Sequence, residues 1–262
     1  MEVKYDTIGT GYNLTRKADN FLTVQLLHHL KPTRNGKYLD IGCGTGNYTI
    51  EMKKKGFHFM GIDPSKKMLE KAKRTNKEIE WKLGSAENTG LAKNSLDGII
   101  GFLTIHHWTD LKSAFTELNS VLKPEGRIVI FTSTPQQMQG YWLNHYFPKM
   151  MATSILQMPT LESVQTTMIE SGIEPVGADK YFIRTDLQDK FLYCGKHNPE
   201  LYFNEKIRHG ISSFSSLANR EEVERGLSKL RKDIDNGNIN EIIKSYENDD
   251  GDYLYIIGKN GA

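Results

Sequence analysis

The segment KYLDIGCGTGNYT, residues 37–49, restricts the fold of this chain more than any other part of the sequence. A short apolar run leads into Asp40, and glycine then occupies positions 42, 44 and 46. An apolar run, a glycine-rich turn and a stretch of helical spacing, in that order, predict a strand, a tight loop and a helix. Because glycine has no side chain, the backbone N–H groups of such a loop and the positive helix end can approach a polar or anionic ligand. We therefore expect a binding site here, in a protein of the α/β class.

The rest of the chain alternates short apolar runs with stretches in which apolar residues recur at helical spacing. We expect strands at residues 37–42, 57–63, 79–84, 96–103, 127–133, 174–183 and 252–259, and helices at 17–30, 47–56, 64–74, 110–123 and 161–172. The Pro-Glu-Gly segment at 124–126 is expected to turn the chain into the fifth strand. This order predicts a Rossmann-like, seven-stranded, mostly parallel sheet with helices on both faces.

Two segments depart from this alternation. Residues 135–160 are rich in aromatic residues, Met, Gln and Pro, and residues 186–248 are more polar and mostly of helical spacing. We expect both to form a helical cap over the sheet. The charged run at 220–235 is interpreted as the solvated face of a helix.

Composition excludes several classes of protein. A formal net charge of +2 in 262 residues gives no broad basic face, so nucleic acid is not an expected partner. The first residues show no signal segment and no apolar run is long enough to span a bilayer, so a cytoplasmic protein without a membrane partner is expected. The two cysteines, Cys43 and Cys194, have no metal-binding spacing, so we expect free thiols and no metal site.

The glycine spacing separates two common nucleotide-binding loops from this one. A dinucleotide-binding turn counted from Gly42 requires glycine at position 47, where this chain has Asn47. A phosphate-binding P-loop counted in the same way requires glycine and lysine where Asn47 and Tyr48 stand. The residues themselves favour another ligand, because Asp40 ends the first strand, where its carboxylate can hold an ammonium group. Asp63 ends the second strand, where an acid in such folds binds the ribose hydroxyls.

A third polar group follows the third predicted strand. The segment GSAEN places Ser85, the Ala86 amide and Glu87 where they can bind the edge of a purine ring. Together with LDIGCGTGNYT, GIDPSKKML, TIHHWTD and LKPEGRIVI, this segment resembles class I S-adenosylmethionine-dependent methyltransferases in order and spacing. The resemblance is greatest to the small-molecule branch that includes ubiquinone/menaquinone-pathway and trans-aconitate methyltransferases. It covers residues 5–133 and, more weakly, the terminal strand.

The resemblance implies a set of cofactor contacts. Asp40, Gly42 and Gly44 would hold the methionine end, and Asp63 the ribose. The remaining predicted contacts to S-adenosylmethionine are Pro64 or Met68 at the adenine face, Ser85, Ala86 and Glu87 at its edge, and Cys43 and Phe102 in the surrounding wall. The chain departs from the family pattern at Ser85, where aspartate is common. The segment at 5–16 resembles the N-terminal lid, which implies that Tyr12 and Arg16 close over the cofactor and its carboxylate.

The resemblance also implies how the chain is divided. Residues 1–134 would form a cofactor-binding core with the N-terminal lid, and residues 135–262 a substrate cap with the last helix and strands of the same sheet, in one domain overall. Aromatic residues of the cap would enclose a small molecule with an apolar or aromatic portion. These residues are Tyr141, Trp142, His145, Tyr146 and Phe147.

His107 follows the fourth strand, at the edge where ligands bind in open α/β folds, and is the candidate base for an acceptor that must lose a proton. Two other functions stay open at this point. An NAD(P)-dependent oxidoreductase would share the sheet and the ribose acid, and a non-catalytic S-adenosylmethionine-binding protein would share the whole cofactor site. Whether the acceptor atom is oxygen, nitrogen or carbon, and whether the protein is a monomer or a homodimer, is left undetermined.

Overall fold

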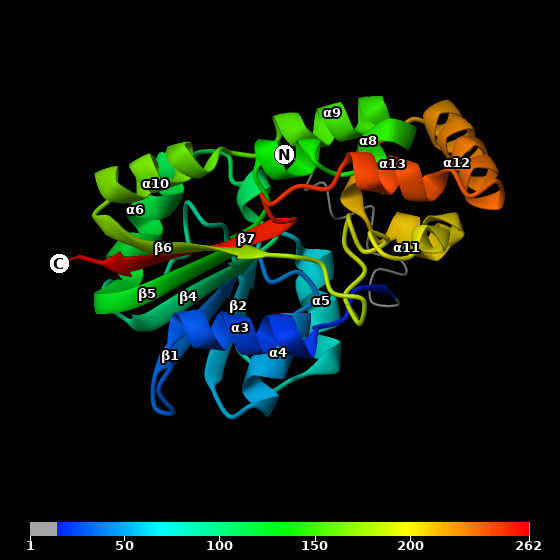
Figure 1. Cartoon of the computed structure of the whole chain (residues 1–262). Coiled ribbons are helices and arrows are strands. Elements are labelled where there is room, and N and C mark those ends of the chain that lie inside the picture. The colour runs from blue at the N-terminus through cyan, green and yellow to red at the C-terminus, as the bar shows by residue number, and fades with distance from the viewer. Residues whose placement is uncertain (1–14, 262) are drawn as a thin grey trace.

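The computed structural model describes residues 15–261 (Figure 1). Its centre is a seven-stranded sheet in the order β3-β2-β1-β4-β5-β7-β6. Strands β1 to β5 are parallel, whereas β7 lies antiparallel between β5 and β6. The strands are β1 Lys37–Ile41, β2 His58–Asp63, β3 Trp81–Leu83, β4 Leu96–Phe102, β5 Leu122–Thr132, β6 Ile173–Tyr181 and β7 Tyr253–Asn260. The predicted seven-stranded, mostly parallel sheet is confirmed.

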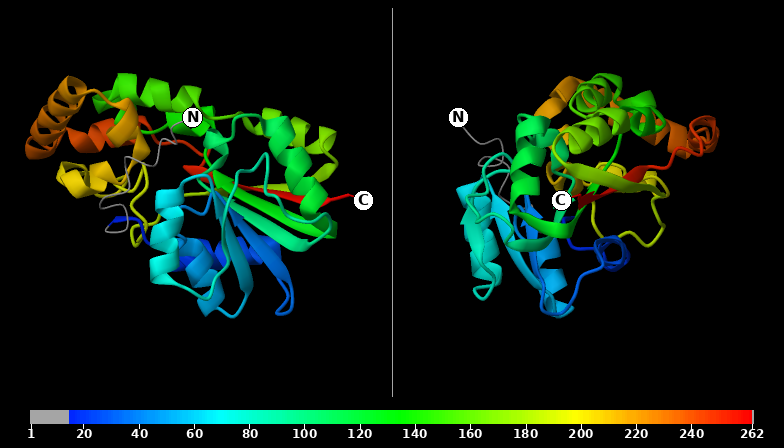
Figure 2. Two further views of the ribbon diagram at one scale, coloured as in Figure 1. Left: turned by 180° about the vertical axis from the view of Figure 1, so that it is seen from behind. Right: turned by 90° about the vertical axis from the view of Figure 1, so that its left-hand side faces the viewer.

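Helices cover both faces of the sheet (Figures 1 and 2). The helices next to the strands are α3 Asn20–Leu30, α4 Asn47–Lys54, α5 Lys66–Thr75, α6 Leu111–Val121 and α10 Leu161–Glu170. Buried side chains of α3 and α4 belong to one apolar cluster, and those of α6 and α10 to another. This separation follows from strand geometry, because successive side chains of a strand point to opposite faces. Ile99 and Ile100 of β4 illustrate it, since they belong to different clusters.

Several element boundaries differ from the sequence prediction, and two of these differences have a clear physical cause. Helix α5 starts at Lys66, not at Pro64, because the Ser65 hydroxyl accepts a hydrogen bond from the Met68 N–H and acts as the N-cap. Strand β5 starts at Leu122, which pairs with Leu96, so the expected turn at residues 124–126 lies within the strand. A register shift in this pairing accommodates the extra residues, as a β-bulge does.

The cap consists of residues 135–158 and 184–248 and lies beyond one end of the sheet (Figures 1 and 2). Its elements are α7 Pro135–Gln139, α8 Leu143–Tyr146, α9 Pro148–Leu156, η2 Pro199–Phe203, α11 Glu205–His209, η3 Ser213–Leu217, α12 Arg220–Asp235 and α13 Ile239–Ser245. The two segments are joined by buried polar contacts. The Glu222 carboxylate accepts hydrogen bonds from the Lys149 and Met150 N–H groups at the start of α9, and the Tyr146 hydroxyl donates to Asp233.

The aromatic residues of 141–147 form the interior of the cap. Trp142 is 0% exposed and packs edge-on against Tyr146 and Tyr202, with ring centroids 5.9 and 5.6 Å away. These residues belong to the same apolar cluster as Leu22 of α3 and Phe131 of β5. The cap and the sheet therefore share one core. The prediction that Trp142 lines a substrate pocket is wrong, because its side chain is fully buried in this core. In a sequence, a large aromatic residue is equally compatible with a pocket wall and with a protein interior.

Candidate active site

A cavity of about 460 Å³ lies between the carboxyl ends of the central strands and the cap. Its sheet side comes from the loops after β1, β2, β4 and β5, and its cap side from α9, η3 and the chain around Asp189. Ligands of open α/β sheets bind at this edge, outside the carboxyl ends of the strands. The sequence predictions for residues of different loops therefore converge on one space.

The three glycines of the loop after β1 all have positive φ, but each meets a different neighbour. At Gly42, where φ is 69°, a Cβ atom would lie 2.0 Å from the Thr104 hydroxyl oxygen. At Gly46, where φ is 76°, it would clash with the Trp81 ring. At Gly44, where φ is 55°, an added Cβ atom would have no atom within 4 Å apart from its chain neighbours, and this residue lines the cavity. Gly44 is thus the position at which a side chain would occupy space meant for a ligand, whereas the other two allow the loop to pack.

The N–H groups at the start of this loop point to β2. Those of Gly42 and Cys43 donate to the Ile62 carbonyl oxygen, at 2.8 and 3.0 Å, and that of Gly44 donates to Asp63 Oδ2 at 2.8 Å. These three N–H groups already have acceptors in β2, so the approach of the loop's N–H groups to a polar or anionic ligand stays a prediction. The last two residues of β2 accept all three hydrogen bonds, and these bonds fix the loop against the strand.

Carboxylates dominate the charge of the cavity wall. Asp40 is 2% exposed and accepts a hydrogen bond of 2.6 Å from the Thr49 hydroxyl. Burial raises the pKa of Asp40 to about 7, the Thr49 hydrogen bond opposes this shift, and the charge of Asp63 adds to it. Among the described lining residues, Asp40, Asp63 and Asp189 are acidic and Arg16 is the one lysine or arginine. Such a wall favours a ligand that carries positive charge.

The Asp63 carboxylate accepts backbone hydrogen bonds from the glycine loop and from the chain before α5. Its Oδ2 accepts the Gly44 N–H, and its Oδ1 accepts the Ser65 N–H at 2.8 Å. One carboxylate thus ties the glycine loop to the start of α5. Each carboxylate oxygen has more than one acceptor site, so both bonds are compatible with a contact to ribose hydroxyls.

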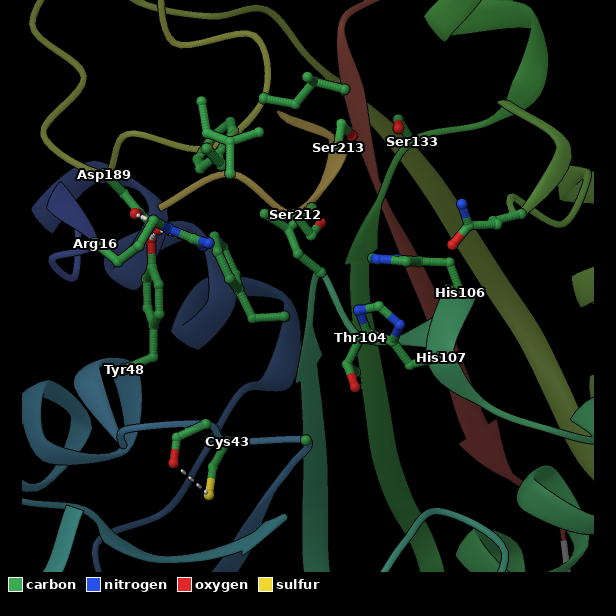
Figure 3. A pocket seen from close by; sticks show the side chains of 18 of the residues that line it. Arg16, Cys43, Tyr48, Thr104, His106, His107, Ser133, Asp189, Ser212 and Ser213 are labelled. Atoms are coloured by element: carbon green, nitrogen blue, oxygen red, sulfur yellow. Dashed lines mark hydrogen bonds and ion pairs between the residues drawn. The ribbon is translucent and has the colours of Figure 1, made fainter. Parts of the chain in front are cut away.

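Arg16 lies at the opposite end of the cavity from the histidines (Figure 3). Its Nε donates to Asp189 Oδ1 at 2.6 Å, and its Nη2 lies 3.3 Å from Asp189 Oδ2. The Tyr48 hydroxyl also donates to Asp189 Oδ2, at 3.3 Å, and the Tyr48 ring stacks on Phe102 with centroids 3.9 Å apart. Asp189 and Tyr48 were not predicted from the sequence.

Most predicted site residues lie together. The cavity is lined by Arg16, Asp40, Gly42, Cys43, Gly44, Asp63, Pro64, Met68, Phe102 and His107. Cys43 and Cys194 are free thiols, and burial raises the pKa of the Cys43 thiol well above its ordinary value, so it is uncharged at neutral pH. Tyr12 and the rest of the predicted lid up to residue 14 lie outside the described residues.

Ser85, Ala86 and Glu87 do not line the cavity. Glu87 instead accepts the Thr109 N–H at 2.6 Å, just before helix α6. An acidic side chain at this position satisfies backbone donors that a helix start leaves without partners. Contact of these three residues with a purine stays a prediction that the cavity lining does not support.

His107 lies in the short helical turn η1, Ile105–His107, which follows β4. His106 and His107 both line the cavity, with ring centroids 3.9 Å apart, and Figure 3 shows them facing the same space. Cap residues complete this half of the wall. Its neutral polar members are Ser133, Ser154, Gln157, Ser212 and Ser213, and its apolar members include Met138, Met158, Leu192, Ile211 and Leu217. Isolated serines in a helical segment give no sequence signal for such a role.

Within residues 15–261, no helix is long and apolar enough to cross a membrane. Nor do the His, Cys, Asp and Glu side chains of these residues form a group of three that could hold a metal ion.

Comparison with known proteins identifies related sequences. A family described as a methyltransferase domain matches residues 39–130. A solved structure from an antibiotic biosynthesis pathway of Anabaena variabilis, described as a candidate methyltransferase, is 32% identical. The match covers 93% of this chain and 98% of that one, with a TM-score of 0.82.

Two curated proteins are more distant relatives. The demethylmenaquinone methyltransferase of Thermotoga maritima is 26% identical over 65% of this chain and 86% of its own length. The biotin biosynthesis bifunctional protein BioHC of Cellvibrio japonicus is 27% identical over 85% of this chain, but the match spans 49% of that longer protein.

Proposed function

This chain belongs to the class I S-adenosylmethionine-dependent methyltransferases, and we propose that it methylates a small, uncharged acceptor with an apolar portion inside the cavity beneath the cap. S-adenosylmethionine is its cofactor. The observation that carries the proposal is the open face of Gly44 in a wall of three carboxylates, beside the lining residues of 154–158 and 211–217, whose side chains are all neutral. The first part suits a cationic cofactor and the second an uncharged acceptor.

The residues of the acidic half fit the cofactor by their chemistry. We assign Asp40 to the ammonium group of the methionine end, Asp63 to the ribose hydroxyls, and Pro64 and Met68 to the adenine face. Arg16 is assigned to the methionine carboxylate. When bound, S-adenosylmethionine supplies a methyl group that is already activated by its sulfonium.

The chain's own contribution to the reaction is alignment, exclusion of water and proton removal. The cap covers the cavity, so the acceptor can be held in one orientation away from water. His107 is assigned to accept the proton of an acceptor whose nucleophilic atom carries one. A carboxylate acceptor would require no base. Within residues 15–261, the lining side chains of 154–158 and 211–217 include no lysine or arginine to bind a carboxylate, which argues for an acceptor that carries a proton.

The test is transfer of a deuterated methyl group. The protein is incubated with S-adenosylmethionine deuterated at the methyl group and a mixed extract of small metabolites, and products that carry the label are found by mass spectrometry. The Gly44→Val variant is the matched control, because its side chain fills the cofactor space. Labelled products that are extractable into organic solvent and absent in the control are expected. Labelling only of anionic metabolites would contradict the proposed acceptor class.

Calorimetry, together with the labelling experiment, separates methyl transfer from the two alternative functions. An NAD(P)-dependent oxidoreductase would bind NADH in preference to S-adenosylhomocysteine. A non-catalytic binding protein would bind S-adenosylhomocysteine and label nothing. The cytoplasmic location, the absence of nucleic-acid and membrane partners, the division into cofactor core and substrate cap, and the choice between monomer and homodimer stay predictions from the sequence.

A further inference from the structure

Asp189 lies where the cap crosses the chain that precedes helix α3. Hydrogen bonds on both sides attach this stretch of the cap. The Gln188 N–H donates to the Asp19 carboxylate at 2.9 Å, and the Lys190 N–H donates to the carbonyl oxygen of residue 15 at 3.1 Å. Three consecutive cap residues therefore contact the segment 15–19, with Asp189 in the middle and facing the cavity.

The ion pair of Asp189 with Arg16 is poorly explained as a stabilising feature. The Asp189 side chain is 2% exposed and that of Arg16 13%. Burial raises the pKa of Asp189, and the neighbouring guanidinium compensates for only part of this shift. Removing two charges from water costs free energy that their attraction does not reliably return. A buried ion pair at the wall of a cavity is better explained by a role in orienting the Arg16 guanidinium.

The surrounding contacts fix Arg16 at both ends. The Asn47 side-chain amide donates to the Arg16 carbonyl oxygen at 2.8 Å, which holds its backbone against the first residue of α4. At the other end, Asp189 binds the guanidinium side-on through Nε and Nη2. Tyr48, the second residue of α4, donates to the same carboxylate. Both attachments lead to the helix that follows the glycine loop, so the guanidinium is held in register with that loop.

Asp189 binds the guanidinium along its Nε–Nη2 edge, and the planar group has a second edge of N–H donors with the geometry to bind another carboxylate. We propose that Asp189 is a positioning residue for the cofactor: it holds the Arg16 guanidinium where it meets the carboxylate of the methionine end. Without Asp189, the Arg16 side chain loses the carboxylate that holds its Nε and Nη2 in this orientation. The inference rests on the proposed role of Arg16 in cofactor binding.

The test compares two ligands by calorimetry. S-adenosylhomocysteine carries the carboxylate, and S-adenosyl-3-thiopropylamine is the same molecule without it. In the Asp189→Asn variant, affinity for S-adenosylhomocysteine is expected to fall about tenfold, whereas affinity for the second ligand stays within about twofold. In an Arg16→Gln background, Asp189→Asn is expected to cause no further loss, because its effect passes through Arg16.

Asp186→Asn is the matched control. It removes the same charge from the same stretch, but Asp186 is exposed and paired with Arg184, so neither affinity should change. If Asp189→Asn does not fold, Tyr48→Phe removes one hydrogen bond to the carboxylate and should give a smaller loss that is again confined to S-adenosylhomocysteine.

Equal losses for both ligands would show a purely structural role and overturn the inference. So would an unchanged affinity in Asp189→Asn, or an Arg16→Gln variant that binds S-adenosylhomocysteine as tightly as the natural chain. A natural chain that binds neither ligand would overturn the proposed function, and the inference with it.

Discussion

Replacing Asp40 by asparagine should stabilise the protein, and more so at alkaline pH. The pKa of Asp40 is raised from 3.8 to about 7, chiefly by burial. The folded state thus keeps this proton at pH values where the unfolded chain has lost it. Stability therefore falls as pH rises from about 4 to about 7, and the whole loss is present above pH 7. Asparagine has no charge at any of these pH values, so the variant is free of this loss.

The magnitude follows from the size of the shift. A shift of about three pH units corresponds to about 4 kcal/mol, and about two of these units, or ~2.5 kcal/mol, fall between pH 5 and pH 7. The hydrogen bond from the Thr49 hydroxyl needs no separate pH-dependent correction, because it already opposes the rise of the Asp40 pKa used here, and the asparagine carbonyl oxygen can accept the same bond. We expect Asp40→Asn to gain about 2–3 kcal/mol more in unfolding free energy at pH 8 than at pH 5, and to bind S-adenosylhomocysteine more weakly.

Urea unfolding at the two pH values measures this difference. Asp97→Asn is the control. Burial acts to raise the pKa of Asp97, but the hydrogen bonds from Lys123 and Lys37 lower it overall. This carboxylate is ionised in both states above pH 5, so its variant should lose the same stability at pH 5 and pH 8. An Asp40→Asn variant whose change in unfolding free energy is equal at both pH values would refute the reasoning.

Three further variants test the site and the cap. Gly44→Ala should abolish most cofactor binding at a backbone cost of about 1–2 kcal/mol, and Gly237→Ala, also at positive φ with open space around it, measures that cost alone by thermal unfolding. Asp63→Ala should weaken S-adenosylhomocysteine binding by about 1–3 kcal/mol and also lower stability, because two backbone N–H groups lose their acceptor; unchanged affinity in calorimetry would remove Asp63 from the site. Trp142→Ala should destabilise the protein by about 3–5 kcal/mol in urea unfolding, and a loss below 1 kcal/mol would contradict its place in the core.

The sheet was predictable because its signal is local. The central parallel strands are mostly buried on both faces, so each appears in the sequence as a short apolar run, and an acid or glycine at the strand end marks the binding edge. Asp40, Gly44 and Asp63 were found in this way. The start of β5 was misplaced for a related reason, since Pro124 and Gly126 are typical of turns but here lie in a bulged strand.

The rest of the site depends on tertiary contacts that carry no local signal. Asp189 stands in a polar stretch that resembles any surface loop, and its role becomes visible only where the chain meets Arg16. Trp142 shows the converse case, because the same aromatic residue suits a pocket wall or an interior. Glu87 was read as a ligand contact, but the bond it makes is to the backbone before α6.

The placement of the cap along the chain bears on how such enzymes diversify. One cap segment is inserted after β5 and the other between β6 and β7, so neither interrupts the strands that carry Asp40, Gly44 and Asp63. Insertions and substitutions in these two segments can therefore alter the acceptor during evolution while the cofactor loops are inherited unchanged. The shared interior restricts these changes, because Trp142 belongs to the same apolar cluster as Leu22 of helix α3. A chimaera that exchanges caps between relatives should fold only when the α3 face is exchanged with them.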